Sequence, residues 1–263
     1  MKKFISILLA LTLLVVPACL MACGNDKATA NDVEGDADND KAEKKVLTMA
    51  TNAEFPPYEF YEGEDIVGID AEVAALIADK LGMELEIVDT DFDSIIPGVQ
   101  SGKYDMGMAG MTVTEDRLLS VNFSDSYATG VQVVIVKDGS DIKDLDAISG
   151  KKIGVQTSTT GDIYATDDFG EENVVRFANG ALAVEALKDG KVDCVIIDNE
   201  PAKSYVAANE GLSILETEYA VEDYAICFNK NDAELQKDVN DALKALIADG
   251  SVQDIVDKYI NAD

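Results

Sequence analysis

Residues 105–117 read D-M-G-M-A-G-M-T-V-T-E-D-R. The apolar residues 106–109 predict a short buried strand, and Gly110 ends it. In open α/β sheets, ligands bind at the carboxyl ends of the strands, and a glycine there lets a ligand approach the backbone closely. The Thr112 hydroxyl can donate or accept a hydrogen bond, and the Arg117 guanidinium matches a carboxylate. This stretch has two equally good interpretations. It can be a binding site for a small acid, or an ordinary strand and turn followed by a surface arginine.

The composition excludes several classes of function. The chain has 263 residues, a formal net charge of −30, no histidine and no tryptophan. Nucleic-acid binding needs a basic surface, so it is not expected here. Without histidine there is no imidazole for acid–base or metal chemistry. The four cysteines include no pair at zinc spacing. No metal and no cofactor are expected.

The N-terminus has the pattern of a secretion signal. Two lysines at 2–3 precede an apolar run at 4–16, which is too short to span a bilayer comfortably. Leu20-Met21-Ala22-Cys23 follows and resembles the bacterial lipobox, in which cleavage precedes a lipid-carrying cysteine. We therefore expect a lipoprotein signal peptide at 1–22 and lipidation of Cys23, with Cys19 as a weaker candidate. The alternative is an ordinary signal with incidental cysteines.

Residues 23–45 are expected to form a disordered acidic tether. They are rich in Asn, Asp, Ala, Glu and Lys and hold almost no large apolar side chains, so burial cannot offset the entropy of ordering them. A lipid on Cys23 would anchor the protein to the outer face of the cell membrane, with no other contact to the membrane.

Beyond the tether, apolar strands alternate with amphipathic helices. Asp70 is expected to cap the helix that ends at Gly82. Residues 52–61 are expected to form a loop, because Pro56 and Pro57 prevent helix geometry. The predicted strands are 46–51, 85–88, 131–136, 152–156, 194–197 and 224–228. The predicted helices are 70–81, 92–100 with an interruption near Pro97, 181–188, 200–208, 232–247 and 252–260.

Two further strand ends carry polar groups. Residues 157–161, T-S-T-T-G, follow a strand and begin a helix, so their N–H groups favour an anion. Thr159 or Thr160 can cap that helix at the same time. Asp198 ends another strand, where it could hold an ammonium group or simply cap the next helix. Cys194 and Cys227 fall in apolar strand patterns, which favours buried free thiols over a disulfide.

A local pattern occurs twice. Residues 101–105, S-G-K-Y-D, and residues 189–193, D-G-K-V-D, each end a helix at a glycine and open a strand at an aspartate. This repeated helix–glycine–strand order suggests two α/β lobes.

Taken together, the motifs from about residue 46 to 260 resemble the family-3 extracellular solute-binding proteins, the amino-acid-binding subunits of bacterial ABC importers. The matching stretches are T-N-A-E-F-P-P-Y-E-F (51–60), G-I-D-A-E-V-A (68–74), F-D-S-I-I-P-G-V-Q-S-G-K-Y-D (92–105), A-G-M-T-V-T-E-D-R (109–117), V-N-F-S-D-S-Y (121–127), I-G-V-Q-T-S-T-T-G (153–161) and V-I-I-D (195–198). Each motif alone is weak, but their order and spacing together are specific.

The resemblance implies a periplasmic-binding-protein type II fold. Two Rossmann-like α/β lobes are joined by a two-strand hinge, and the ligand is enclosed between them. By this likeness, lobe 1 covers 46–131 plus 222–263 and lobe 2 covers 132–221. The partners implied are a free amino acid and the membrane permease of an ABC importer, and a monomer is expected.

The resemblance also implies the binding residues. Arg117 and the N–H groups of Thr112 and Thr160 match the groups that hold the ligand α-carboxylate. The Gly110 carbonyl, the Thr112 hydroxyl and Asp198 match those that hold the α-ammonium. The complete set of expected ligand-binding residues is Asn52, Phe55, Phe92, Ala109, Gly110, Thr112, Arg117, Gln156, Thr159, Thr160 and Asp198.

Two departures from the family pattern bear on the ligand. Asn52 stands where glutamine and basic-amino-acid binders often have an aspartate, and whether Glu54 compensates stays open. Ser158 replaces the common glycine of the turn. Among family members, those that bind arginine, lysine or histidine look closest in the stretches V-Q-T-S-T-T-G and I-I-D-N. The expected ligand is therefore a polar amino acid, with arginine and glutamine as the leading candidates.

The expected function is therefore capture and not catalysis. A rival is an enzyme of the same fold that dehydrates amino-acid-like cyclic acids, but the candidate acids already have roles in binding. A second rival is a surface lipoprotein that only binds other proteins. A sensor would be expected to carry a spanning helix after the domain.

Overall fold

The computed structural model describes residues 45–260, which fold as mixed α/β with three sheets. The expected signal peptide at 1–22, both candidate lipidation sites, Cys19 and Cys23, and residues 23–44 of the expected tether lie outside the described residues. Within 45–260, no helix is both long and apolar enough to cross a membrane.

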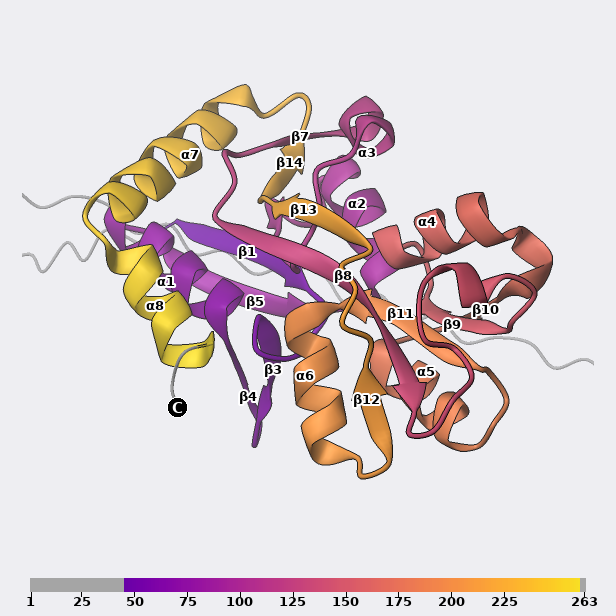
Figure 1. Cartoon of the computed structure of the whole chain (residues 1–263). Helices are drawn as coiled ribbons and strands as arrows, with labels where there is room; N and C mark the ends of the chain where they lie inside the picture. Colours follow the sequence, from indigo (N-terminus) through magenta and orange to yellow (C-terminus); the bar gives the residue numbers. More distant parts are fainter. Residues whose placement is uncertain (1–44, 261–263) are drawn as a thin grey trace, which may run out of the picture. The chain divides into compact units, whose positions relative to one another are not determined.

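The first large sheet has the strand order β5-β1-β6-β14-β7 (Figure 1). Its strands are β5 (Glu84–Asp89), β1 (Val46–Thr51), β6 (Met106–Gly107), β14 (Cys227–Asn229) and β7 (Val121–Phe123). β1 lies parallel to β5 and β6, whereas β14 runs antiparallel to its neighbours. Helices α1 (Ile69–Leu81), α7 (Ala233–Ala248) and α8 (Ser251–Ile260) share one hydrophobic core with this sheet. Helix α2 (Phe92–Gln100) covers the core on the opposite face.

A small antiparallel sheet extends the same lobe. It consists of β2 (Glu54–Phe55), β3 (Glu59–Glu62) and β4 (Asp65–Val67). The expected loop over 52–61 is therefore partly extended, paired backbone. The first sheet, this small sheet and helices α1, α2, α3 (Glu115–Ser120), α7 and α8 are called the first lobe below.

The second large sheet has the order β10-β9-β11-β8-β12, and β13 also pairs with β8. The strands are β10 (Val174–Phe177), β9 (Ile153–Gln156), β11 (Cys194–Asp198), β8 (Ala128–Lys137), β12 (Leu212–Ile214) and β13 (Ala220–Tyr224). Helices α4 (Thr160–Phe169), α5 (Gly180–Lys188) and α6 (Asn199–Ala208) cover it, and short 3₁₀ helices occur at Asp146–Ile148 and Glu171–Asn173. These elements are called the second lobe.

Strand β8 shows why this sheet needs cover on both faces. Val133 and Ile135 pack with residues of α5 and α6, while Val134 and Val136 pack in a separate core that includes Ala165 of α4. Successive side chains of a strand point to opposite faces, and a strand buried on both sides has the continuous apolar run seen here.

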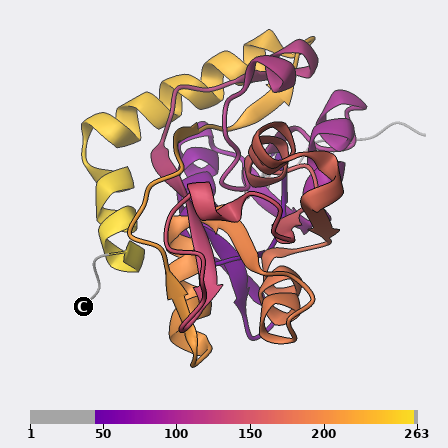
Figure 2. The same cartoon turned by 45° about the vertical axis from the view of Figure 1, so that its right-hand side comes forward.

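Two chain crossings join the lobes. The chain leaves the first sheet after Phe123, enters the second at Ala128, and returns between Tyr224 and Cys227 (Figures 1 and 2). Tyr224 pairs with Ala128, so the crossings lie next to each other as a two-strand hinge. The fold class predicted from the sequence is confirmed. The lobe boundaries themselves stay a prediction.

Three local predictions were wrong. Residues 224–228 are not one strand, because the chain changes sheets at Ala225 and Ile226, whose N–H groups bond to the Met111 carbonyl and the Ser124 hydroxyl. Helix α2 continues through Pro97, and the buried side chains of Ile95 and Val99 hold it in place.

The third concerns Asp70. Gly68 occupies the N-cap of α1, and Asp70 lies inside its first turn, where its carboxylate accepts the Gly110 N–H at 2.9 Å. At the other end, the helix stops at Gly82 as predicted, and Gly82 adopts the left-handed conformation common at helix ends. The rest of the predicted helices and strands are present with bounds shifted by a few residues. Cys194 and Cys227 are buried free thiols, as favoured from the sequence.

Candidate functional site

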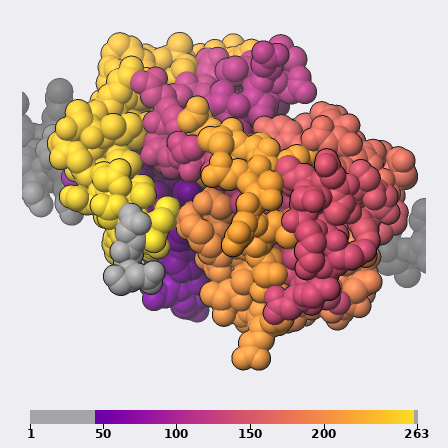
Figure 3. Space-filling view, viewed as in Figure 1, coloured from indigo at the N-terminus to yellow at the C-terminus, as the bar shows by residue number. Residues whose placement is uncertain are grey.

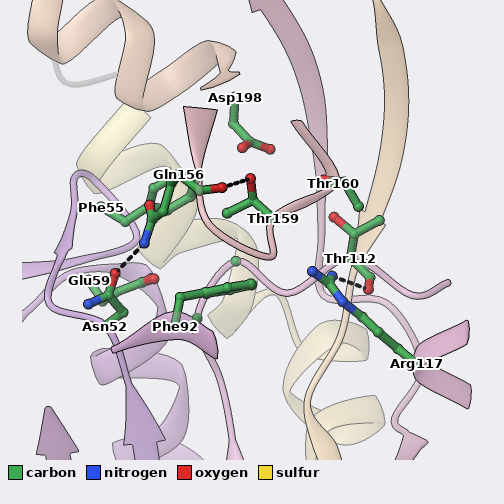
Figure 4. Close-up of a pocket in the computed structure, with 12 residues that line it drawn as sticks. Asn52, Phe55, Glu59, Phe92, Thr112, Arg117, Gln156, Thr159, Thr160 and Asp198 are labelled. Carbon is green, nitrogen blue, oxygen red and sulfur yellow. Dashed lines mark hydrogen bonds between the residues drawn. The ribbon is translucent and has the colours of Figure 1, made fainter. Parts of the chain in front are cut away.

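The carboxyl ends of strands from both large sheets meet at one cavity (Figure 4). It holds about 310 Å³ of space outside the protein atoms, part of which is open to solvent. Every residue that was expected to bind ligand lines it, together with one more, Glu59. The lining residues are Asn52, Phe55, Glu59, Phe92, Ala109, Gly110, Thr112, Arg117, Gln156, Thr159, Thr160 and Asp198.

Arg117 is the buried cation of the cavity. One of its terminal nitrogens donates to the Thr112 carbonyl at 2.8 Å and the other to the Ser158 carbonyl at 3.0 Å. Its guanidinium lies over the Phe92 ring, 5.3 Å from the centroid. Burial lowers its pKa, while the charges of Glu222 and Asp198 act in the opposite direction. No carboxylate in residues 45–260 forms an ion pair with it, so its remaining N–H groups can receive one from a ligand.

The turn between β9 and α4 faces Arg117 from the second lobe. Ser158, the residue in place of the family's glycine, has a φ of +64°. Thr159 occupies the N-cap of α4, and its hydroxyl accepts the Asp162 N–H. Asp162 in turn accepts the Ser158 N–H at 3.0 Å and pairs with Arg176. The turn is thereby fixed, with the amino end of α4 at the cavity wall, where the helix dipole favours an anion.

Asp198 is the buried anion on the second lobe. It ends β11 at the N-cap position of α6, but its side chain makes no capping hydrogen bond. The alternative prediction of a helix cap is confirmed for the position of Asp198 but not for its side chain. Its carboxylate instead accepts the hydroxyl of Tyr224. Burial first, and then the neighbouring carboxyl group of Glu222, raise the pKa of Asp198.

Gly110 is required at the floor of the cavity for two reasons. Its φ is +51°, which disfavours residues with a side chain. A Cβ at this position would also lie 2.8 Å from Cε1 of Phe55. Because its N–H donates to Asp70, the turn after β6 is tied to α1.

Glu59 was missed from the sequence. It lies on β3, is 1% exposed, and lines the cavity, whereas Glu54 is exposed and does not. The signal that could have found it is a carboxylate between Tyr58 and Phe60, in the segment that holds the expected ligand-binding residues Asn52 and Phe55. Tyr58 itself is part of the core.

Four carboxyl groups are buried in or beside the cavity, against one guanidinium. Asp70, next to Glu59, has its pKa raised to about 6 by burial. Burial, followed by the charge of Asp70, raises the pKa of Glu59 well above its usual range. Glu222 is 4% exposed and accepts Gln132 Nε2 at 2.9 Å. This excess of buried acid favours a ligand that brings positive charge.

Hydrogen bonds cross between the lobes around the cavity. Besides Arg117 to Ser158, the Gln156 amide donates to Asn52 Oδ1 at 2.8 Å. The Tyr205 hydroxyl donates to the Glu54 carbonyl at 2.7 Å. In the space-filling view, atoms of the two lobes meet along the face shown (Figure 3). No set of acidic or cysteine side chains in the described residues is placed to hold a metal ion.

Comparison with known proteins places this arrangement in context. The sequence profile of the bacterial extracellular solute-binding proteins, family 3, matches residues 47–262. The chain is 32% identical over 261 residues to the arginine-binding extracellular protein ArtP of Bacillus subtilis, covering 95% of this chain and 98% of that protein. It is 31% identical over 275 residues to the ABC transporter glutamine-binding protein GlnH of the same organism, covering 100% and 99%.

A solved structure shares the fold. An ancestral arginine-binding protein bound to glutamine superposes with a TM-score of 0.78 at 40% identity, covering 82% of this chain and 98% of that one.

Proposed function

Because the chain belongs to the bacterial extracellular solute-binding proteins of family 3, we propose that it captures a free polar amino acid outside the cytoplasm and delivers it to the membrane permease of an ABC importer. One observation carries the proposal. Arg117 of the first lobe and Asp198 of the second, both buried, line the same enclosed cavity. This pair of opposite charges is complementary to the α-carboxylate and α-ammonium of an amino acid.

Each charged group of the ligand has its own set of partners, here called a half-site. Arg117 and the N–H groups of Thr112 and Thr160 hold the α-carboxylate. Asp198, the Gly110 carbonyl and the Thr112 hydroxyl hold the α-ammonium. Removing both charges from water is costly unless each is paired and hydrogen-bonded, so the two half-sites act together.

Lobe closure follows from this division. A ligand that contacts only one lobe makes half of its bonds, and the full set forms only when the lobes meet. This difference in contacts shifts the population toward the closed form, which the permease then recognises.

The side-chain end of the pocket favours a basic amino acid, with glutamine second. Phe55 and Phe92 flank this end, and the amides of Asn52 and Gln156 offer hydrogen bonds to either side chain. Glu59 supplies the carboxylate that Asn52 lacks. The similarity to arginine- and glutamine-binding proteins agrees with this order.

Anchoring is part of the proposal. Lipidation of Cys23 would hold the protein on the outer face of the cell membrane, where a tether over 23–45 gives the domain reach to a permease. The protein would act as a monomer and without a cofactor.

Mass spectrometry of protein purified from its own host, without added ligand, tests the function directly. We expect one co-purified amino acid. Thermal unfolding with each of the twenty amino acids should show stabilisation of several degrees by that same one. Protein that carries none and is stabilised by none would contradict the proposal. Intact-mass analysis of the same sample, showing a lipid on Cys23, on Cys19 or on neither, tests the anchor.

A further inference from the structure

Glu59 and Asp70 form a pair of buried carboxyl groups behind the side-chain end of the cavity. Both are 1% exposed or less. The N–H of Asp70 donates to the carbonyl of Tyr58, the residue before Glu59, at 2.9 Å, so the two residues lie next to each other. The charge of Asp70 helps to raise the pKa of Glu59. Oε2 of Glu59 and Oδ1 of Asp70 nevertheless have no well-formed hydrogen bond to any described group. Two bare carboxylates would leave both atoms as unsatisfied acceptors, which is costly in a buried position.

The groups around the pair do not supply a compensating cation. Tyr127 and Tyr58 face it from the chain before β8 and from the loop before β3, and Asp198 faces it from β11. Tyr205 of α6 also lies near Glu59. Within residues 45–260, neither carboxyl group forms an ion pair. The single hydrogen bond from a backbone N–H, that of Gly110, reaches Asp70.

The position of the pair tells which part of a ligand would meet it. In Figure 4, Glu59 lies on the side of Asn52 and Gln156, and Arg117 lies on the opposite side. If Arg117 holds the α-carboxylate, the far end of an extended side chain points to Glu59. Asp198 and Glu222 form the other acidic pair, but they face the α-ammonium, which every amino acid carries.

We propose that Glu59 and Asp70 share one proton while no cation is bound, and that a cationic amino-acid side chain takes the place of this proton, which leaves to the solvent. The inference rests on the proposed function. Two neighbouring buried carboxyl groups do not both ionise readily, and they titrate as a pair. A guanidinium beside Glu59 removes the penalty of the second charge, so the O–H bond breaks and the proton passes to buffer. A glutamine amide removes no charge penalty, so the proton stays. The O–H group of Glu59 then donates a hydrogen bond to the amide oxygen.

Calorimetric titration in buffers of different ionisation enthalpy counts the protons released on binding. L-Arginine and L-glutamine are the two probes, at neutral pH. Both bring the same α-groups, so the difference between their counts reports the side-chain end alone. We expect arginine to release about one proton more than glutamine. Affinity for arginine should fall about tenfold for each pH unit of acidification below the titration of the pair, and affinity for glutamine should fall less steeply.

Matched variants assign the effect. Glu59→Gln keeps the shape of the side chain but removes the shared proton, and Asp70→Asn keeps an oxygen that accepts the Gly110 N–H. In Glu59→Gln, the arginine-specific proton release should drop to less than half. In Asp70→Asn, Glu59 keeps the larger part of its raised pKa, which burial causes, so the release should drop by less. Glu54→Gln makes the same change on an exposed side chain of the neighbouring strand and should release protons as the unaltered protein does.

The outcomes separate the two claims. Protein that binds no amino acid contradicts the proposed function. Protein that binds arginine with no more proton release than glutamine, or that binds glutamine but not arginine, leaves the function standing and overturns the role of the pair. Unchanged release in Glu59→Gln overturns it as well.

Discussion

At the residue scale, Arg117 is the proposed partner of the ligand carboxylate, and it also joins the lobes. It donates to a carbonyl of its own lobe, at Thr112, and to a carbonyl of the other, at Ser158. With the lobes together, these two bonds hold the guanidinium in a fixed plane. A group that is already ordered loses less entropy on binding.

Arg117→Ala should abolish amino-acid binding, measured by calorimetry, because the α-carboxylate loses its charged partner. The truncated side chain also leaves two carbonyls without donors. The far-ultraviolet circular dichroism spectrum should remain that of a folded protein. Lys237→Ala, which removes an exposed cation on α7, is the matched control and should bind normally. Unchanged affinity in Arg117→Ala would show that the site works differently.

Gly110→Ala should lower both stability and affinity. The left-handed conformation costs a side-chain-bearing residue about 1–2 kcal/mol, and the added Cβ meets Phe55 at 2.8 Å. Chemical unfolding measures the first effect and calorimetry the second. Gly63→Ala, at an exposed glycine with φ +68° and open space around its Cβ, carries the conformational cost alone. Equal losses in the two variants would mean that the contact with Phe55 is unimportant.

At the element scale, the site is a set of strand ends. β1, β6, β9 and β11 each stop at the cavity, and each ends in, or is followed by, a residue that lines it. This placement explains why much of the site was predictable. A polar residue or glycine that ends an apolar run marks a carboxyl strand end, as at Gly110 and Asp198.

Some features of the site could not be predicted in this way. Glu59 and Glu54 have the same chemistry and lie five positions apart, and only the pairing of β2 with β3 decides that one faces the cavity. Asp70 has the sequence position of a helix cap, but a long-range bond to Gly110 replaces that role. Both outcomes depend on contacts between segments distant in sequence, which local patterns do not encode.

Thr159→Ala should destabilise the protein by about 1 kcal/mol, because α4 loses the N-cap that accepts the Asp162 N–H. Thr159→Ser keeps the hydroxyl and should stay close to the unaltered protein. Urea unfolding of the ligand-free forms measures the difference. If both variants lose the same stability, the methyl group and not the cap is responsible.

At the scale of the whole molecule, buried acids set the response to pH. The pKa of Asp70 is about 6 in the folded protein, compared with an ordinary value of 3.8. Between these values the folded state binds more protons than the unfolded state, so stability falls as pH rises. Glu59 and Asp198 shift in the same direction. The net charge of −30 adds self-repulsion that also grows with pH.

The ligand-free protein should therefore have a larger free energy of unfolding near pH 5 than near pH 7.5. The difference between the two pKa values of Asp70 corresponds to about 3 kcal/mol over the range from pH 4 to pH 6. Urea unfolding across this range measures it. Asp70→Asn should flatten the dependence, and Glu54→Gln should not. A dependence that is unchanged in Asp70→Asn would assign it to other groups.

The hydrogen bond from Tyr205 to the Glu54 carbonyl spans the two lobes at a place away from the ligand's charged groups. The chain contains no tryptophan. Tyr205→Trp would place the single tryptophan of the chain at this point. Its fluorescence lies at a longer wavelength than that of the tyrosines, and its intensity should change with the separation of the lobes. The tryptophan fluorescence of this variant would therefore report the closure of the lobes when an amino acid binds.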